Sequence, residues 1–422
     1  MREQTGKHHT FECALSPFPI RIVNRIGTIL SQMRISLGPF TDQSLIDKAC
    51  SKTGLFDFGS DFSPDPLRLL LDACEREAHL TLVGRLAARH NILRLLANRL
   101  RLVENFKHFP AIAREDIRHP IFIIGLPRTG STFLHNLLAQ DPNNRAPLTW
   151  EVLSPSPPLD HLHANGDPHI ARTEKLLQRF DWLAPRFKSI HAMGATLPIE
   201  CVAIMGHAFI SQQFQTTWHI PSYKKLIEDG DTRPAYTFHR WFLQYLQWRS
   251  PPRQWILKAP AHIFSLEDLL SVYPDALFLH THRDPLKVMG SVASLGTVLR
   301  RAFSDQVDPQ TIGVEVLQQW TKGIQRAINV REKEETVQNR FLDVYYQDLV
   351  GDPMRTIQRI YSHYHLELTE QAKAEMRRYL RKERRNNDIH RYSLASFGLT
   401  PEMVNVHFQT YTKRFHINPE PA

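Results

Sequence analysis

The sequence has little of what marks a secreted or membrane-spanning protein. Its 422 residues include only four cysteines, Cys13, Cys50, Cys74 and Cys201. They are scattered without C-x-x-C spacing, which argues against a disulfide scaffold and favours a reducing compartment. No window approaches eighteen uninterrupted apolar residues, so no transmembrane segment is predicted. We therefore expect a soluble, cytoplasmic protein.

The composition also excludes a disordered or fibrous chain. Hydrophobic residues make up 42% and charged residues 23% of the sequence, which is ordinary for a folded globular protein. Lysine and arginine exceed aspartate and glutamate by 52 − 43 = +9, which favours acidic partners. Six of the nine residues of Arg377–Arg385, "RRYLRKERR", are basic. We interpret this run as a solvated helix face, with peripheral membrane contact as the alternative.

Helical and strand patterns divide the chain into three parts. Residues 1–115 predict a helical N-terminal extension, with apolar residues at helical spacing from Leu82 to Val103 and arginines such as Arg99 mostly off that stripe. Within it, Asp65 is expected to cap a helix that begins at Pro66. Residues 116–365 alternate strands with helices, which predicts an α/β domain with a parallel sheet. Residues 366–422 are expected to form a basic, helical tail that packs on this domain.

Four short apolar segments are the predicted strands: Ile121–Ile124, Trp255–Lys258, Leu277–His282 and Phe341–Tyr346. Ligands of open α/β sheets bind at the carboxyl ends of the strands, so the site is expected at that edge. Aromatic residues between the first and second of these strands are expected in the core, with the wall of an acceptor pocket as the alternative. They are Trp218, Tyr223, Tyr236, Phe238, Trp241, Phe242, Tyr245 and Trp248.

The loop after the first strand predicts an anion site. Gly125–Thr132, "GLPRTGST", is close to the Walker pattern G-x-x-x-x-G-K-[ST], but Ser131 stands where that pattern has lysine. The nearest cation is Arg128, three residues earlier. Glycines let the backbone turn sharply and approach a ligand, and the following helix offers its positive N-terminal end. The loop should therefore bind a phosphate-like group, but not as an ATPase does.

A second polar segment follows the third strand. In "HTHRDPLKVMGSVASL", Arg283 ends the strand, Asp284 is placed as a helix N-cap, and Pro285 lies where the first helical turn tolerates proline. Ser291 comes eight residues after Arg283, on the second turn. Both side chains can then point toward the same crevice at the strand ends.

Together the two segments resemble the sulfotransferases that use 3′-phosphoadenosine 5′-phosphosulfate (PAPS). The similarity is greatest to bacterial sulfotransferase-family proteins, with motif similarity to tyrosylprotein sulfotransferases. It implies a P-loop-like fold in which the loop holds the 5′-phosphosulfate and Arg283 with Ser291 holds the 3′-phosphate. In that family no γ-phosphate or magnesium has to be reached, so the Walker lysine has no task. The donor-binding residues implied are Pro127, Arg128, Thr129, Gly130, Ser131, Thr132, Arg283, Ser291 and Tyr346, the last beside the adenine.

The same resemblance implies the catalytic residues. Lys258, in "WILKAPAH", matches a lysine near the transferring sulfuryl group, and with Arg128 it is expected to stabilise the leaving phosphate. Two residues compete as the base for the acceptor hydroxyl. Glu151 lies two residues further along than the glutamate base of tyrosylprotein sulfotransferases, and His262 follows Lys258 by four residues rather than the two of cytosolic sulfotransferases. We prefer Glu151, because a carboxylate among several cations stays ionised near neutral pH.

Three further expectations concern the acceptor, metal binding and the C-terminal segment. The hydroxyl acceptor is a small molecule, lipid, sugar or tyrosine, and no nucleic-acid partner is expected. His280 and His282 share a strand face without an apparent third ligand, so no metal is expected. Near the C-terminus, "HRYSLASFGL" resembles a recurrent ending that brings His390, Arg391 or Tyr392 near the 3′-phosphate.

Two alternative functions compete with a sulfotransferase. One is a P-loop kinase or NTPase, which is disfavoured by Ser131 and by the lack of an obvious acidic residue for magnesium. The other is a non-catalytic nucleotide-binding protein with the sulfotransferase fold. The joint presence of Arg128, Lys258, Arg283 and Ser291 argues against that second reading.

Overall fold

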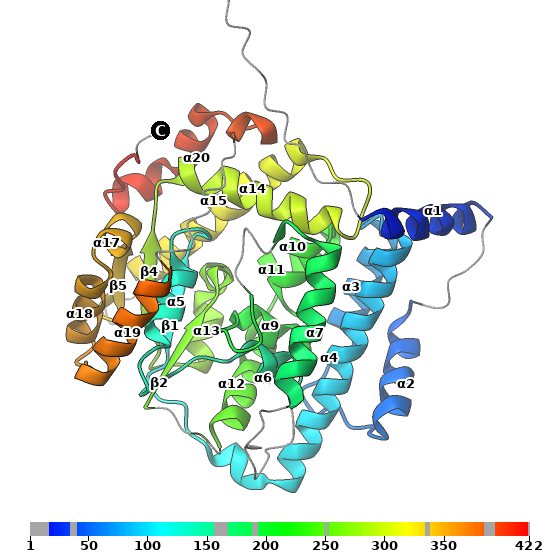
Figure 1. The fold of residues 1–422 in the computed structure, drawn as a ribbon, viewed down its shortest axis with the longest axis horizontal. Coiled ribbons are helices and arrows are strands. Elements are labelled where there is room, and N and C mark those ends of the chain that lie inside the picture. Colours follow the sequence, from blue (N-terminus) through cyan, green and yellow to red (C-terminus); the bar gives the residue numbers. More distant parts are fainter. Residues whose placement is uncertain are drawn as a thin grey trace, which may run out of the picture.

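A five-stranded parallel sheet lies in one half of the molecule (Figure 1). The structure is a computed structural model that describes residues 17–33, 40–155, 168–187, 193–248, 250, 253–333, 338–383 and 393–420. The strands lie in the order β2-β3-β1-β4-β5, and every pair of neighbours is parallel. Their bounds are β1 (Ile121–Gly125), β2 (Asn144–Arg145), β3 (Gln254–Lys258), β4 (Leu277–His282) and β5 (Phe341–Tyr345).

The predicted fold class is confirmed, and the four predicted strands are β1, β3, β4 and β5. The prediction for β5 was one residue too long, because Tyr346 begins the helix α17 (Tyr346–Gly351). The strand β2 was not predicted. It consists of two polar residues that pair with β3 at the sheet edge, so it carries no apolar run.

Both faces of the sheet are buried, because successive side chains of a strand point to opposite sides. In β1, Ile121 and Ile123 join an apolar cluster with α5 (Ser131–Leu138), α18 (Pro353–His363) and α19 (Glu370–Glu383). Phe122 and Ile124 join a larger cluster on the other face. That cluster includes α12 (Arg233–Gln247), α13 (Leu266–Val272), α14 (Pro285–Arg301), α15 (Pro309–Lys333) and α20 (Pro401–Arg414).

The N-terminal helices lie on the side of the molecule opposite α17–α19 (Figure 1). They are α1 (Phe18–Gln32), α2 (Asp42–Thr53), α3 (Asp65–Arg76) and α4 (Leu82–His108), followed by the 3₁₀ turn η1 (Pro110–Arg114). The start of α3 differs from the prediction by one residue, since Pro64 is the N-cap and Asp65 is already helical. Buried residues of α2, α3 and α4 belong to the same apolar cluster as Phe122 of the sheet.

Arg99 corrects one detail of the helical pattern. It was expected off the apolar stripe of its helix, but it is 1% exposed. Its guanidinium donates to the Phe58 carbonyl at 2.7 Å and to Asp61 at 2.7 Å, and it lies over the Phe238 ring. Burial is tolerated because these partners satisfy the charge.

The segment between β2 and β4 contains all of the aromatic residues that were predicted to lie in the core. Its helices are α6 (Thr149–Leu153), α7 (Pro168–Leu183), α9 (Cys201–Met205), η2 (Gly206–Ala208), α10 (Gln212–Thr217), α11 (Pro221–Asp229), α12, η3 (Pro260–Phe264) and α13. The aromatic residues that are buried as predicted are Trp218, Tyr223, Tyr236, Phe238, Phe242 and Tyr245. Trp241 and Trp248 are partly buried against the same cluster.

The C-terminal segments return to the α/β domain. Helix α19 packs on α5, and α20, with the turn η4 (Leu394–Phe397), packs on α14 and α15. Among the described residues, no helix is long and apolar enough to cross a bilayer. His390, Arg391 and Tyr392, and the last two residues of the basic run, lie outside the described residues.

Candidate active site

The loop between β1 and α5 is shaped by the close approach of β1 to β4. Gly125 pairs with Thr281 and has φ +127°, and a Cβ at this position would lie 2.4 Å from the Thr281 carbonyl oxygen. Only glycine fits there. Further along, the Thr129 hydroxyl donates to the Leu126 carbonyl (2.7 Å) and lies 2.6 Å from the Thr281 hydroxyl. The Thr129 side chain therefore fastens the loop to the sheet, and its backbone is the part that can face a ligand.

The loop leads into a helix start suited to an anion. Gly130 is the N-cap of α5 and has no side chain with which to cap it. The first amides of a helix lack intrahelical partners and carry the positive end of its dipole. Ser131 and Thr132 add hydroxyl groups at the same point. Arg128 has φ +65°, an uncommon conformation for a non-glycine residue, of the kind found at functional sites.

The two predicted anion-binding segments meet. Arg128 Nε donates to Ser291 Oγ at 3.0 Å, and Arg283 Nη1 donates to the Arg128 carbonyl oxygen at 3.0 Å. Asp284 caps α14 as predicted, accepting from the Leu286 amide at 2.9 Å. The Arg283 guanidinium lies 3.7 Å from the centre of the Tyr346 ring. One ligand can thus contact both segments.

Arg128, Arg283 and Tyr346 line a cavity of about 470 Å³. Its wall includes residues of the β1–α5 loop, α17 and α19. Its lining residues are Pro127, Arg128, Gly130, Ser131, Thr132, Phe133, Glu200, Pro260, Arg283, Leu295, Tyr346, Val350, Pro353, Leu380 and Glu383. The basic run of α19 thus contributes Leu380 and Glu383 to the cavity, although its arginines Arg377, Arg378 and Arg381 are exposed.

Lys258 brings a further cation to the same end of the sheet. It is the last residue of β3, its side chain is 2% exposed, and its Nζ donates to Thr132 Oγ1 at 3.2 Å. Its ammonium also forms an ion pair with Glu200, which lines the cavity and is 25% exposed. Glu200 precedes α9 and lies in no motif that the sequence revealed.

Comparison with known proteins decides the family. Residues 120–370 match the family model described as "Sulfotransferase family". The chain belongs to this family. It is therefore a sulfotransferase, as the two anion-binding segments predicted.

Its relatives include mycobacterial sulfotransferases. The structure of sulfotransferase STF1 from Mycobacterium tuberculosis H37Rv is 32% identical and has a TM-score of 0.78, covering 87% of this chain and 98% of that one. Sulfotransferase STF9 from Mycobacterium avium is 26% identical, with a TM-score of 0.81 and coverage of 92% and 100%. Omega-hydroxy-beta-dihydromenaquinone-9 sulfotransferase Stf3 of Mycobacterium bovis is 28% identical over 324 residues, 72% of this chain and 77% of the relative.

Glu151, the preferred base in the sequence, is held by local contacts. One carboxylate oxygen accepts from Arg145 at 2.7 Å and the other from the Leu148 amide at 2.9 Å. The second bond is part of the capping box that starts α6. Glu151 is buried and is not among the residues that line the cavity. The sulfotransferase thus uses this carboxylate to fix a helix start and an arginine.

His262, the other candidate base, is also apart from the cavity lining. It is fully buried in η3, its Nδ1 lies 2.8 Å from the Tyr236 hydroxyl, and Phe122 packs edge-on against the ring. Burial, with a smaller contribution from His239, holds the pKa of His262 well below its usual range. The neighbouring residue Pro260 lines the cavity, but the His262 ring packs in the core.

His280 and His282 lie with Asp343 in a buried cluster that contains a protein cation. Arg331 donates to His280 Nδ1 at 3.0 Å and to Asp343 at 2.7 Å, and His282 Nε2 lies 2.8 Å from Asp343. Burial would raise the pKa of Asp343, but its bonds to His282 and Arg331 outweigh burial and lower that pKa far below its usual range. The arginine therefore supplies the positive charge that this carboxylate needs.

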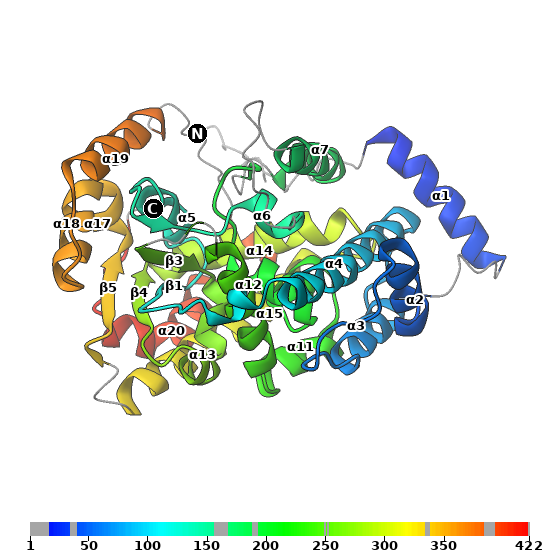
Figure 2. The same cartoon turned by 90° about the horizontal axis from the view of Figure 1, so that it is seen from below.

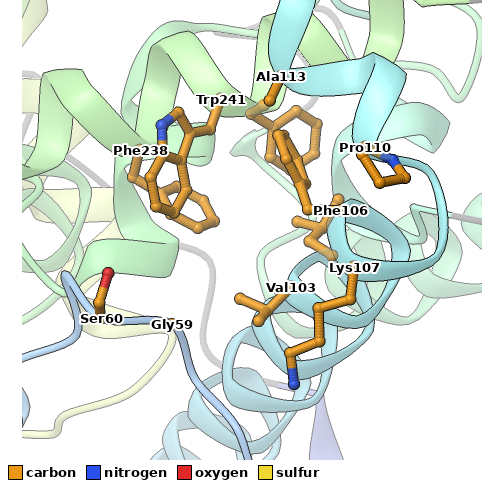
Figure 3. Close-up of a pocket in the computed structure, with 11 residues that line it drawn as sticks. Gly59, Ser60, Val103, Phe106, Lys107, Pro110, Ala113, Phe238 and Trp241 are labelled. Carbon is orange, nitrogen blue, oxygen red and sulfur yellow. The ribbon is translucent and has the colours of Figure 1, made fainter.

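A second, apolar cavity of about 310 Å³ lies between α4, η1 and α12 (Figure 3). Phe106, Phe238 and Trp241 form its walls, and Lys107 runs along its mouth with the ammonium turned away from the rings toward Asp57 at 2.8 Å. It shares no lining residue with the cavity at the strand ends. Some predicted core aromatics thus also line a cavity, but not the one beside Lys258.

Proposed function

We propose that this sulfotransferase transfers the sulfuryl group of PAPS to a hydroxyl group of a small-molecule acceptor. The meeting of Arg128 and Arg283 in one cavity, with Ser291 in contact with Arg128, carries the proposal. A nucleotide with phosphates at both ends of its ribose needs two anion sites a few ångströms apart. The name of the Stf3 relative describes a hydroxylated menaquinone as its acceptor. We therefore place hydroxylated isoprenoid quinones first among the acceptors to be tried.

Donor binding is assigned to residues that line the cavity and to Ser291, which contacts Arg128. The amides at the start of α5, with Ser131, Thr132 and Arg128, would hold the 5′-phosphosulfate. Arg283 and Ser291 would hold the 3′-phosphate, and Tyr346 would lie beside the adenine. PAPS supplies an activated sulfuryl group whose departure leaves adenosine 3′,5′-bisphosphate. The groups that we assign to PAPS are cations, hydroxyls and backbone amides. A magnesium ion would instead be suited by carboxylates.

Lys258 and Glu200 are assigned to the transfer step. Lys258, with Arg128, would stabilise the negative charge that grows on the leaving phosphate oxygen as its bond to sulfur breaks. Glu200 would accept the proton of the acceptor hydroxyl as the new oxygen–sulfur bond forms. The support for Glu200 is its place in the cavity wall beside Lys258, whereas Glu151 and His262 are engaged elsewhere.

Donor binding is the first test. Calorimetry should show that the wild-type protein binds adenosine 3′,5′-bisphosphate and that Arg283→Ala binds it much more weakly. Transfer is then followed with PAPS carrying labelled sulfur and a panel of hydroxylated acceptors. No binding by the wild-type protein would overturn the proposal. Binding without transfer to any acceptor would favour a non-catalytic protein, and turnover of ATP with magnesium would favour an NTPase.

The base is tested by matched carboxylate substitutions. Glu200→Gln is expected to lower kcat by roughly a hundred- to ten-thousandfold, to abolish the acid limb of the pH–rate profile, and to retain donor binding. Glu151→Gln, the control, should lower stability through the lost Arg145 contact and leave the pH profile unchanged. The opposite pattern would restore the sequence-based preference for Glu151. Loss of the acid limb in a His262→Gln variant alone would assign the base to His262.

A further inference from the structure

Helix α1 packs against the rest of the protein with its more polar side. Its buried residues are Ile20, Asn24 and Gly27, which recur at helical spacing. Asn24 Oδ1 accepts from the Val83 amide of α4 at 3.1 Å. Gly27 lies so near α4 that a Cβ on it would be 2.4 Å from that of Leu82. The contact with α4 therefore leaves the apolar side of α1 turned outward.

The outward side of α1 is a continuous apolar stripe. Of the twelve strongly exposed large apolar side chains in the described residues, six lie between Phe18 and Met33. At ~100° per residue, five of them fall within about a quarter of the helix circumference: Phe18, Ile22, Ile26, Ile29 and Met33. Exposed apolar residues scattered singly are normal, but a patch of this kind marks an interaction surface.

The charges beside the stripe indicate what covers it. Arg21 and Arg25 are exposed along one edge of the stripe, and the sequence of α1, "FPIRIVNRIGTILSQ", contains no carboxylate. The first half of α4, on which α1 packs, adds Arg89 and no acidic residue, whereas Arg85 there forms an ion pair with Glu75 of α3. A basic amphipathic helix of this kind lies in the interface of an anionic lipid surface.

We propose that α1 docks this protein on an anionic membrane surface, with the stripe Phe18–Met33 inserted among the lipid chains and Arg21 and Arg25 at the headgroups. The helix is free to do so, because it projects from the body of the molecule at the end remote from α17–α19 (Figure 2). In the same view α1, α7 and α19 lie along one edge of the molecule. A membrane in contact with α1 would therefore face the side on which α19 lines the cavity at the strand ends. The docking depends on α1 alone and not on the proposed reaction.

The experiment is cosedimentation of the full chain with vesicles of phosphatidylcholine, alone or mixed with phosphatidylglycerol. The wild-type protein is expected to bind the mixed vesicles and to bind neutral ones much more weakly. Ile22→Glu combined with Ile26→Glu should reduce binding by more than about tenfold, because both side chains are exposed and the change places charge in the stripe. Arg21→Gln combined with Arg25→Gln should weaken binding to the mixed vesicles by roughly thirtyfold.

The matched control is Val314→Glu combined with Val406→Glu, which puts the same charges at exposed valines of α15 and α20. This variant should bind vesicles nearly as well as the wild type. Equal loss of binding in both double variants, or no binding by the wild type, would overturn the proposal. So would sedimentation equilibrium showing a dimer that Ile22→Glu with Ile26→Glu dissociates, since the stripe would then cover a second copy. An unchanged far-UV circular dichroism spectrum and thermal midpoint verify that each variant is folded.

Discussion

Replacing Glu420 with glutamine is expected to tighten the binding of adenosine 3′,5′-bisphosphate. In the structure the Glu420 carboxylate forms a two-pronged ion pair with Arg283, with Nε–Oε1 at 2.9 Å and Nη2–Oε2 at 3.0 Å. The Glu420 amide also donates to Asp284 at 2.9 Å, which fixes the segment beside the start of α14. A carboxylate thus occupies the arginine to which we assign the 3′-phosphate. The nucleotide has to displace it.

The size of the effect follows from the burial of the pair. The side chains of Arg283 and Glu420 are 19% and 12% exposed, so the pair is largely shielded from water. Hydrogen bonds between charged groups contribute about 1.5–3 kcal/mol, and the cost of desolvating the charges offsets part of this. A net competition of about 1–2 kcal/mol corresponds to a roughly five- to thirtyfold lower dissociation constant for Glu420→Gln.

Isothermal titration calorimetry at a fixed, physiological salt concentration measures this change, because exposed charges are screened by salt. Glu332→Gln is the matched control. It removes the same charge from an exposed pair with Arg414 on α20 and leaves Arg283 untouched. Arg283→Ala should weaken binding in either background. Weaker binding by Glu420→Gln would refute the competition and would mean that the carboxylate orients Arg283 for the phosphate.

Three further results are expected. Lys258→Met should lower kcat by about a hundred- to a thousandfold with little change in the affinity for adenosine 3′,5′-bisphosphate, and a parallel loss of affinity would instead make Lys258 a binding residue. Gly125→Ala should lower the thermal midpoint severely or prevent folding, because the new Cβ meets the Thr281 carbonyl, and an unchanged midpoint would contradict the packing of β1 on β4. Burial lowers the pKa of three histidines to about 3. They therefore stay neutral in the fold while the unfolded chain takes up protons below its ordinary value near 6.5. The free energy of unfolding should therefore keep its full value above pH 6.5. Between pH 6.5 and pH 3, each of His135, His207 and His239 should lower it by up to about 1.4 kcal/mol per pH unit. Urea unfolding at several pH values measures this change.

The two anion-binding segments at the strand ends could be predicted because each is continuous in the sequence. In each, a buried strand runs into a polar turn and a helix, so the sequence alone brings Arg128 and Arg283 to the same sheet edge. Lys258 follows the same rule at the end of β3. Glu200 and Glu420 do not, because neither follows a strand. They reach the site only through the packing of α9 and of the segment after α20.

The same limit explains the error at Arg99 and why the sequence does not show the contacts of Glu151. Helical spacing shows which side of α4 is apolar, but it cannot show that Asp61 and the Phe58 carbonyl will accept the buried Arg99. Glu151 has the residue type and approximate position of a base. Its contacts depend on Arg145, a residue that belongs to no motif recognised in the sequence. Polar contacts between distant segments are thus the part of the site that periodicity does not reveal.

The apolar cluster shared by the sheet and the N-terminal helices has a practical consequence. The family match covers residues 120–370, and a fragment cut at those limits would look complete. Such a cut would remove Leu67, Leu70 and Leu96, all fully buried, from the apolar cluster that also contains the aromatic residues of α12. Truncation for expression or crystallisation should therefore keep α2–α4, since the hydrophobic core extends beyond the limits of the family match.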